Sequence, residues 1–164
     1  MRSMLVPVLC CILAGALFFA GCTDRPEPGA GSSGDAETAR LVAFVHEAQE
    51  YARREGQETA LASFNDPNGS FVRGDLYIFA YDDEGTTLAL PLQPGLVGTS
   101  RWDTQDPDGV FFIRELALAA RNGSGFVRYR YVNPGQHSQI QEKLSYVVPV
   151  DDTWWLGSGI YQED

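Results

Sequence analysis

The chain has 164 residues, with 12 lysine and arginine side chains against 22 aspartate and glutamate side chains, a formal net charge of −10. This length favours one domain with a sizeable core, and the 44% hydrophobic content excludes a chain that is disordered throughout. The acidic balance excludes a nucleic-acid partner, because binding to phosphates requires a basic surface.

The cysteines are confined to the N-terminus. Cys10, Cys11 and Cys22 are the three cysteines of the chain, and the sequence after Cys22 contains none. We therefore expect no disulfide, no thiolate metal cluster and no thiol nucleophile in the folded part.

The N-terminus has the pattern of an export signal. Arg2 precedes an uncharged, mostly apolar run over residues 4–21 that ends in small residues. Residues 19–22 read Phe-Ala-Gly-Cys and resemble the lipobox of prokaryotic lipoproteins, in which the cysteine is lipidated and becomes the first residue after cleavage. We expect residues 1–21 to be a lipoprotein signal peptide and Cys22 to be the lipidation site. The alternative is an uncleaved membrane anchor, and both interpretations place the rest outside the cytoplasm, tethered to the membrane.

A linker separates this segment from the folded part. Residues 23–34 are rich in proline, glycine and serine and almost free of apolar side chains. Such a stretch does not offset the entropy of ordering it. We expect residues 22–35 to be a flexible tether and residues 36–162 to be a single domain.

Two helices are predicted first. A helix over residues 35–55 has Asp35 as its N-cap. Its apolar side chains recur at spacings of three and four and form one stripe: Leu41, Phe44, Val45, Ala48, Tyr51 and Ala52. Gly56 ends or kinks this helix, and residues 58–64 are predicted to form a second, short helix.

Strands and one more helix follow. Residues 75–82 are apolar or aromatic on both faces, which predicts a buried strand, and residues 86–90 are its expected hairpin partner. A long loop over residues 91–109 leads into a helix over residues 110–121. Three consecutive antiparallel strands are predicted over residues 125–132, 140–150 and 153–161. This order indicates an α+β fold, with one sheet of about five strands flanked by helices.

Candidates for catalysis are few. The two histidines, His46 and His137, have neither triad spacing nor a metal-ligand partner, and His46 fits a solvated or core-edge side chain. No Gly-rich phosphate loop follows a strand, and no Gly-x-Ser-x-Gly elbow occurs. Residues 157–159 read Gly-Ser-Gly inside a predicted strand, where glycines favour close packing or a bulge. We expect no enzymatic activity and no cofactor.

One segment partly matches a calcium-binding loop. Residues 106–109 and Glu115 have the required spacing, but the first position would be Thr104, where the loop needs Asp. Pro107 also stiffens the turn. We favour an acidic turn that caps the following helix, where the helix dipole favours carboxylates, and expect no metal site.

Aromatic and cationic side chains gather on two predicted strands. Phe126, Arg128, Tyr129, Arg130 and Tyr131 lie on one strand, and Lys143 and Tyr146 lie on the next. Lys143 is the only lysine of the chain. Two interpretations stay open: an exposed sheet face with ordinary charges, or a pocket in which aromatic rings supply shape and a cation anchors an anionic group.

Several stretches together resemble the single Cache domain, an extracytoplasmic, PAS-like sensor module of prokaryotic chemoreceptors and sensor kinases. They are residues 74–79 (GDLYIF), the turn at 106–109, and residues 125–129 (GFVRY), 142–147 (EKLSYV) and 157–161 (GSGIY). The resemblance covers residues 36–161. It implies a PAS-like Cache fold, in which a long N-terminal helix packs on a central antiparallel sheet, and a small-molecule pocket between the sheet and its covering loops.

The same resemblance implies a ligand and a site. Members of this family commonly bind small organic solutes such as short carboxylates or amino acids. Carried onto this sequence, the pocket residues are Tyr77, Arg101, Trp102, Phe126, Tyr129, Tyr131, Lys143 and Tyr146. We expect a membrane-tethered, extracytoplasmic Cache domain that binds a small organic ligand and presents it to a separate membrane receptor or sensor.

A second interpretation is carried alongside. Receptors of this family continue into another membrane span and a transmitter, and this sequence ends at Asp164. We therefore do not expect direct transmembrane signalling from this chain. The alternative function is a non-catalytic interaction subunit of an envelope complex that binds no ligand.

Overall fold

Two helices begin the part of the chain that the computed structural model describes, residues 33–162. Helix α1 runs over Ser33–Glu55 and α2 over Gln57–Phe64. Gly56 separates them with a φ of 84°, a left-handed conformation that glycine adopts without strain. Both helices lie close to their predicted bounds. However, α1 begins at Ser33, so Asp35 lies in its first turn and is not its N-cap.

The predicted membrane attachment lies outside the described residues. This holds for the signal peptide over residues 1–21, for the lipidation of Cys22 and for the tether up to residue 32. Within residues 33–162, the helices are too short or too polar to cross a bilayer.

The centre of the domain is a five-stranded antiparallel sheet with the order β4-β3-β7-β6-β5. Its strands are β3 (Phe79–Asp82), β4 (Thr87–Ala89), β5 (Gly125–Asn133), β6 (Gln139–Pro149) and β7 (Trp154–Tyr161). The predicted α+β fold, with a long N-terminal helix and about five antiparallel strands, is thereby confirmed. A one-turn 3-10 helix, η1 (Pro94–Leu96), interrupts the long loop after β4.

The predicted strand over residues 75–82 is two strands. β2 (Leu76–Tyr77) pairs with β1 (Val72–Arg73), whereas β3 pairs with β4 and β7. The chain changes partner at Ile78, whose N–H donates to the carbonyl of Phe71 at 3.2 Å. Burial on both faces, which the sequence predicted, holds across the break.

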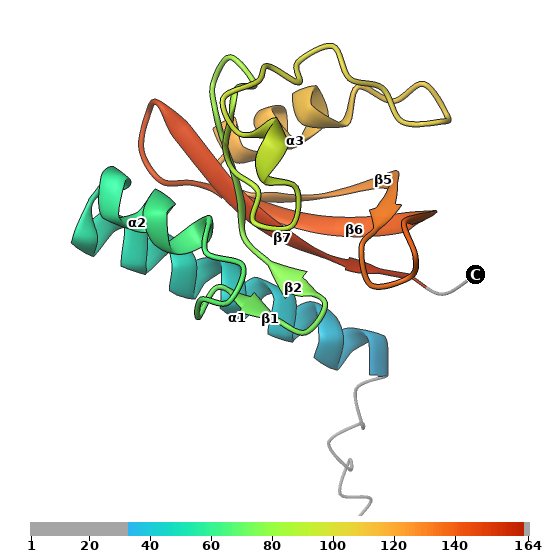
Figure 1. Cartoon of the computed structure of the whole chain (residues 1–164), viewed down its shortest axis with the longest axis horizontal. Helices are drawn as coiled ribbons and strands as arrows, with labels where there is room; N and C mark the ends of the chain where they lie inside the picture. The colour runs from blue at the N-terminus through green and yellow to red at the C-terminus, as the bar shows by residue number, and fades with distance from the viewer. Residues whose placement is uncertain (1–32, 163–164) are drawn as a thin grey trace, which may run out of the picture. The chain divides into compact units, whose positions relative to one another are not determined.

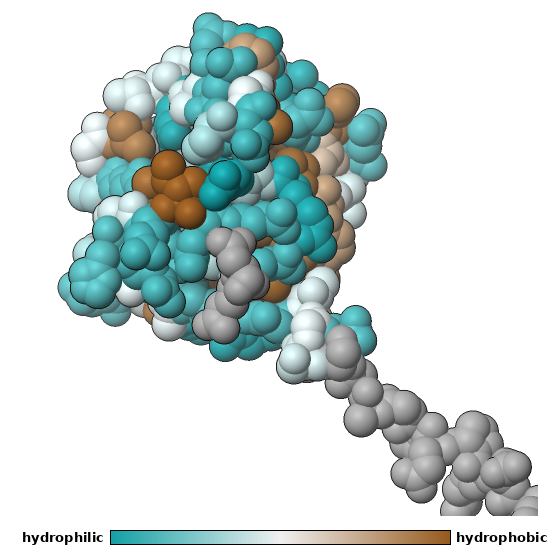
Figure 2. Space-filling model, turned by 90° about the vertical axis from the view of Figure 1, so that its right-hand side faces the viewer, coloured by the Kyte–Doolittle hydropathy of each residue, from teal (hydrophilic) through white to brown (hydrophobic). Residues whose placement is uncertain are grey.

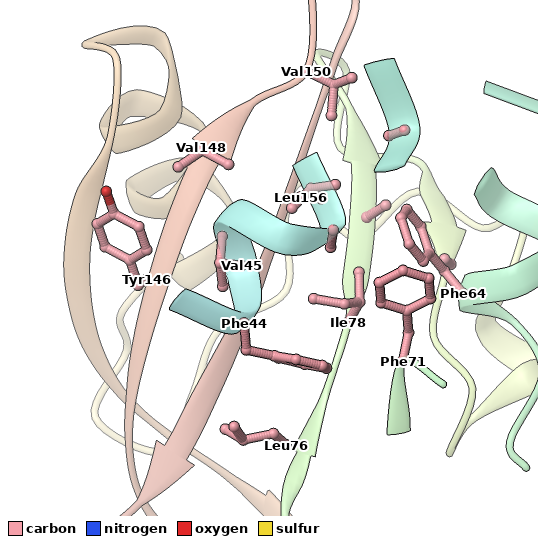
Figure 3. Packing of buried hydrophobic residues seen from close by; sticks show 14 of the residues in the cluster. Phe44, Val45, Phe64, Phe71, Leu76, Ile78, Tyr146, Val148, Val150 and Leu156 are labelled. Atoms are coloured by element: carbon pink, nitrogen blue, oxygen red, sulfur yellow. The ribbon is translucent and has the colours of Figure 1, made fainter. Parts of the chain in front are cut away.

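Helices cover the sheet from two sides, with α1 and α2 on one face and α3 (Phe112–Arg121) on the other (Figure 1). Phe44 and Val45 of α1 pack toward Val148 of β6 and Leu156 of β7 (Figure 3). A second core fills the α3 side. The domain therefore has three layers, with the sheet buried between two apolar clusters.

Strand alternation sends neighbouring residues of β6 to different cores. Leu144, Tyr146 and Val148 face the α1 side, whereas Val147 belongs to the core beneath α3. Lys143 has the same parity as Val147 and therefore also points toward α3. This alternation decides which of the predicted pocket residues meet.

Gly159 of β7 permits close packing against β6. A Cβ at this position would lie 2.6 Å from Cε of Lys143 and 2.9 Å from the carbonyl oxygen of Leu144. Gly159→Ala should therefore lower the free energy of unfolding by about 1–3 kcal/mol, the usual cost of overpacking. Urea denaturation of the two proteins measures the difference.

The matched control is Gly95→Ala in η1, because a Cβ there meets no atom within 4 Å. This control should change stability by less than about 0.5 kcal/mol. Equal midpoints for Gly159→Ala and the unmodified chain would show that β6 and β7 can separate to admit a methyl group.

Candidate functional site

A small cavity with mostly buried walls lies between α3 and the sheet, and we call it the tyrosine chamber. Its walls come from β2, β3, β5, β6, α3 and the loop before α3. The lining side chains are Tyr77, Phe79, Tyr81, Leu90, Arg101, Phe112, Ile113, Leu116, Tyr129, Tyr131 and Lys143. The free volume inside is about 10 Å³, which is room for one water molecule at most.

Lys143 lines the chamber and is 1% exposed. Its Nζ donates a hydrogen bond to the hydroxyl of Tyr77 at 2.8 Å and to that of Tyr161 at 3.4 Å. The same nitrogen lies 4.3 Å from the ring centroid of Tyr77 and 5.5 Å from that of Tyr131. Within residues 33–162, no carboxylate forms an ion pair with it. The ammonium group is thus held by hydroxyls and ring faces alone.

This environment changes proton affinities. Burial lowers the pKa of Lys143 to about 7, while the negative charge of Asp75 opposes the shift. The Asp75 carboxylate is itself paired with Arg40 at 2.8 Å. Burial also raises the pKa of Tyr77 and of Tyr129 well above the usual value. The tyrosines are therefore neutral, and the chamber has no negative group to balance a charged lysine.

Arg101 also lines the chamber and comes from the loop between β4 and α3. Its guanidinium donates to the hydroxyl of Tyr131 at 2.9 Å and, at 3.5 Å, to that of Tyr81. It also lies 5.3 Å from the ring centroid of Phe112. Burial raises the pKa of Tyr81 to about 12, although Arg101 opposes the shift. Arg101, like Lys143, forms no ion pair with any described carboxylate.

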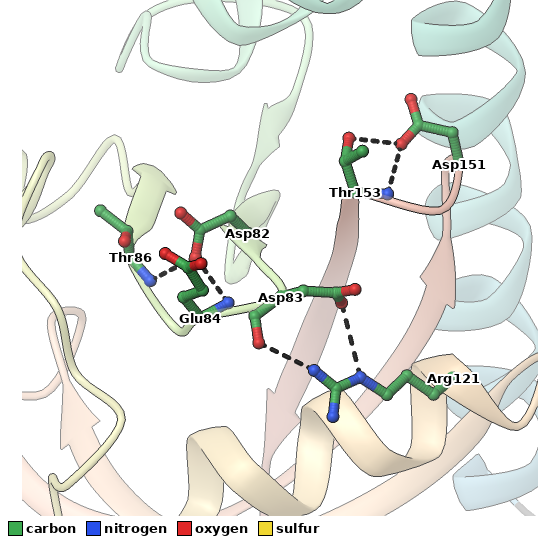
Figure 4. Close-up of polar contacts among 7 residues, drawn as sticks. All are labelled: Asp82, Asp83, Glu84, Thr86, Arg121, Asp151 and Thr153. Carbon is green, nitrogen blue, oxygen red and sulfur yellow. Dashed lines mark hydrogen bonds and ion pairs between the residues drawn. The ribbon is translucent and has the colours of Figure 1, made fainter.

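The turn between β3 and β4 positions the loop that carries Arg101. The Asp82 carboxylate accepts the backbone N–H groups of Glu84 and Thr86, and Arg121 of α3 donates to the Asp83 carbonyl (Figure 4). The Arg101 N–H in turn donates to the carbonyl of Gly85 at 2.8 Å. The turn therefore links α3 to the base of the loop.

Trp102 anchors the same loop and does not line the chamber. Its indole covers Gly85, where an added Cβ would lie only 2.8 Å from Cε3. Arg114 of α3 donates to the Trp102 carbonyl at 3.0 Å. The structure thus places this predicted pocket residue beside Arg101 in the chain but outside the cavity.

Asp106 anchors the end of the loop. Its carboxylate accepts the backbone N–H groups of Asp108 and Val110 at 2.9 Å and that of Arg130 in β5 at 3.0 Å. These bonds hold the pKa of Asp106 below its usual value, although burial acts in the opposite direction. The predicted acidic turn thus binds its own backbone and β5, while the first turn of α3 receives no side-chain cap.

Phe126 and Tyr146 lie on the other face of the sheet. Their ring centroids are 4.7 Å apart, and the Tyr146 hydroxyl lies 3.3 Å from Nε2 of His46 in α1. The structure therefore does not bring these two predicted pocket residues into the chamber. His46 is an exposed side chain at the edge of the α1 core, which agrees with its interpretation from sequence.

The chamber thus unites five of the predicted side chains, namely Tyr77, Arg101, Tyr129, Tyr131 and Lys143. Sequence reasoning missed Tyr81 and Phe79, although both follow Tyr77 at the two-residue spacing of one strand face. It also missed Tyr161, which lies opposite Lys143 in the pairing of β6 with β7. The sequence predicted that these two strands pair, but not the register that brings Tyr161 beside Lys143.

Comparison with known families places this site in context. Residues 39–164 match the family described as Single Cache domain 2. The chain belongs to that family. The predicted resemblance to the single Cache domain is confirmed, and with it the assignment as an extracytoplasmic sensor module.

Two curated relatives are full-length signalling proteins. The sensor histidine kinase MctS of Rhizobium johnstonii is 38% identical over 91 residues, which are 55% of this chain and 20% of MctS. The methyl-accepting chemotaxis protein CtpM of Pseudomonas aeruginosa is 45% identical over 74 residues, 45% of this chain and 13% of CtpM. The matched segments are thus a fifth or less of each relative.

Solved structures share the Cache fold. A methyl-accepting chemotaxis protein from Vibrio parahaemolyticus superimposes with a TM-score of 0.68 at 26% identity, over 77% of this chain and 89% of that one. A Cache chemosensory domain studied for carboxylic acid recognition has a TM-score of 0.66 at 26% identity, over 79% of this chain and 95% of its own. The architecture around the tyrosine chamber is therefore that of a sensor domain.

Proposed function

We propose that this Cache domain binds a short organic carboxylate in the tyrosine chamber, which must widen to admit the ligand because its present free volume of about 10 Å³ holds one water molecule at most. The observation that carries the proposal is Lys143, a fully buried cation without a counter-ion. Burying an ammonium group costs free energy unless an opposite charge or several hydrogen bonds compensate it. A ligand carboxylate beside Nζ would supply both, because charge-assisted hydrogen bonds are the strong ones.

The charges of the chamber also select against amino acids. Both of its charged groups, Lys143 and Arg101, are cations, and no aspartate or glutamate belongs to its lining. An α-amino acid would bring an ammonium group for which this lining has no acceptor of opposite charge. A carboxylate without an amino group therefore fits better. The solved Cache domain that recognises carboxylic acids supports the same ligand class.

A thermal-shift series on the full-length chain in detergent tests the proposal. Propionate, pyruvate and succinate should raise the melting temperature, because a ligand that binds only the native state stabilises it. Alanine and propylamine are the matched controls, since they retain the carbon chain of propionate and add or substitute an amine. Equal shifts with propionate and propylamine, or no shift with any carboxylate, would contradict the proposal.

The alternative is an interaction subunit without a ligand, and the small volume of the chamber favours it. A filled interior is what a domain that only docks on a partner would have. The buried lysine argues against this alternative, because a methionine could fill the same space without the cost of desolvation.

We further propose that the domain is tethered to the membrane and presents its ligand-bound form to a separate membrane receptor.

A further inference from the structure

A second hollow lies directly outside the chamber, and we call it the outer groove. It has a volume of about 320 Å³ and is lined by Arg101, Phe112, Arg130, Tyr131 and residues of the loop before α3. Arg101, Phe112 and Tyr131 also line the chamber. These three side chains therefore lie between the open groove and the buried chamber.

Arg101 is the one of these three side chains with the weakest attachment. Phe112 is 3% exposed and stacks on Tyr129 with ring centroids 4.8 Å apart. Tyr131 belongs to β5, and its hydroxyl donates to Gln93 at 2.8 Å. The guanidinium of Arg101, by contrast, comes from a loop, is half-buried, and is held by hydroxyls at 2.9 and 3.5 Å. An incoming carboxylate could replace those two neutral bonds with charge-assisted ones.

The charges around the groove favour anions. The exposed guanidinium of Arg130 forms no ion pair within the described part of the chain. The neighbouring Asp106 directs its oxygens to three backbone N–H groups. Both Arg101 and Arg130 line this groove, and focused positive potential raises the association rate of anions.

Another hollow lies beside Tyr161, whose hydroxyl contacts Lys143. It has about 550 Å³ and is lined by Glu37, Asp75, Gln136 and other polar side chains. The surface at this end of the domain is mostly hydrophilic (Figure 2). The Glu37 carboxylate repels anions, whereas the charge of Asp75 is balanced by Arg40. Tyr161 is fixed by a 2.7 Å hydrogen bond to the carbonyl of Val132. This polar groove is therefore the less favourable route for a carboxylate.

We propose that the outer groove is the ligand entrance and that Arg101 is its gate, swinging away from Tyr131 to admit an anion into the tyrosine chamber. Arg130 attracts the anion to the groove before Arg101 meets it. The inference rests on the chamber as the binding site, but its test needs no ligand. The gate and the carboxylate specificity can therefore fail independently of one another.

Cysteine accessibility in the full-length chain, purified in detergent, measures passage through the gate. The three native cysteines are replaced by serine, and Leu116→Cys places a single thiol in the chamber wall. Ile113→Cys is the second reporter in case the first does not fold. The probes are the anionic sulfonatoethyl methanethiosulfonate and the neutral methyl methanethiosulfonate, whose modification rates are followed by mass spectrometry.

Removal of the gate with Arg101→Ala should raise the modification rate by both probes about tenfold or more. The reason is that the Arg101 side chain no longer fills the passage between the outer groove and the chamber. Arg130→Gln should slow the anionic probe about threefold at low salt and leave the neutral probe unchanged. A rate that is insensitive to Arg101→Ala, or a thiol that neither probe modifies in any variant, would overturn the gate.

Two blocking variants test the route. Thr104→Trp fills the outer groove and should slow modification at least tenfold, whereas Gln136→Trp in the polar groove should change it less than twofold. The opposite pattern would assign the entrance to the polar groove and overturn the proposal. If a carboxylate that raises the melting temperature also slows modification of the thiol, the probes and the ligand share the chamber.

Discussion

Lys143→Met should abolish the thermal shift caused by propionate and leave the domain folded. Methionine has a similar shape and no charge, so the apolar part of the chamber wall is kept. The ligand loses its cationic partner, which for a buried, hydrogen-bonded charge should weaken binding by about 100-fold or more. The measurement is the propionate thermal shift, followed by titration calorimetry of both proteins at pH 6.5.

The same substitution should also raise the stability of the ligand-free domain, because a desolvated ammonium without a counter-ion is removed. Between pH 7 and 10.5 the unfolded chain holds a proton on Lys143 that the folded domain has released. Stability of the unmodified domain therefore rises with pH in this window, with a slope of up to about 1.4 kcal/mol per pH unit. In Lys143→Met that slope should disappear from urea denaturation series.

The matched control is Arg128→Met on the neighbouring strand. Arg128 is exposed and paired with Glu142 at 2.7 Å, and such surface pairs contribute little to stability. This variant should keep both the propionate shift and the pH slope. A Lys143→Met protein that still binds propionate normally, or that unfolds more readily at pH 7, would exclude Lys143 as the anion site.

Local pattern was sufficient for the helices of this fold and for the strands of its main sheet. The apolar stripe of α1 and the glycine after it determine a helix and its end, because both effects act within a few residues. The break at Ile78 was not predictable in this way. Its cause is a change of partner strand, from β1 to β7, and β7 lies about eighty residues later in the sequence.

The site was predicted only in part, for a related reason. Tyr129 and Tyr131 have the same strand parity, so both reach the chamber, whereas Phe126 lies three residues from Tyr129 and points to the opposite face. Parity could have excluded Phe126, and likewise Tyr146 beside Lys143. The contribution of α3 could not be predicted, because no local signal tells which sheet face a helix covers.

The affinity for a carboxylate should fall as the pH rises above 7. In the free domain, burial lowers the pKa of Lys143 to about 7. A bound carboxylate favours the charged lysine and raises that pKa, so above pH 7 the complex takes up a proton as it forms. The affinity should therefore decrease about tenfold for each pH unit between 7.5 and 9. The titratable and charged groups that face this amine are Tyr77, Tyr129, Tyr131, Tyr161, Arg101 and Asp75.

The single lysine of the chain makes this effect directly observable. Isotope labelling of lysine gives one side-chain signal, which should titrate near pH 7 without ligand and at a clearly higher pH in saturating propionate. Calorimetry at pH 8 in buffers of different ionisation enthalpy should then report the uptake of almost one proton per bound carboxylate. Tyr77 and Tyr161 remain neutral over this range because burial raises their pKa values, so they do not imitate the effect. A lysine signal that titrates above pH 10 in the free domain would show that water reaches Nζ, and the reason for placing an anion there would be lost.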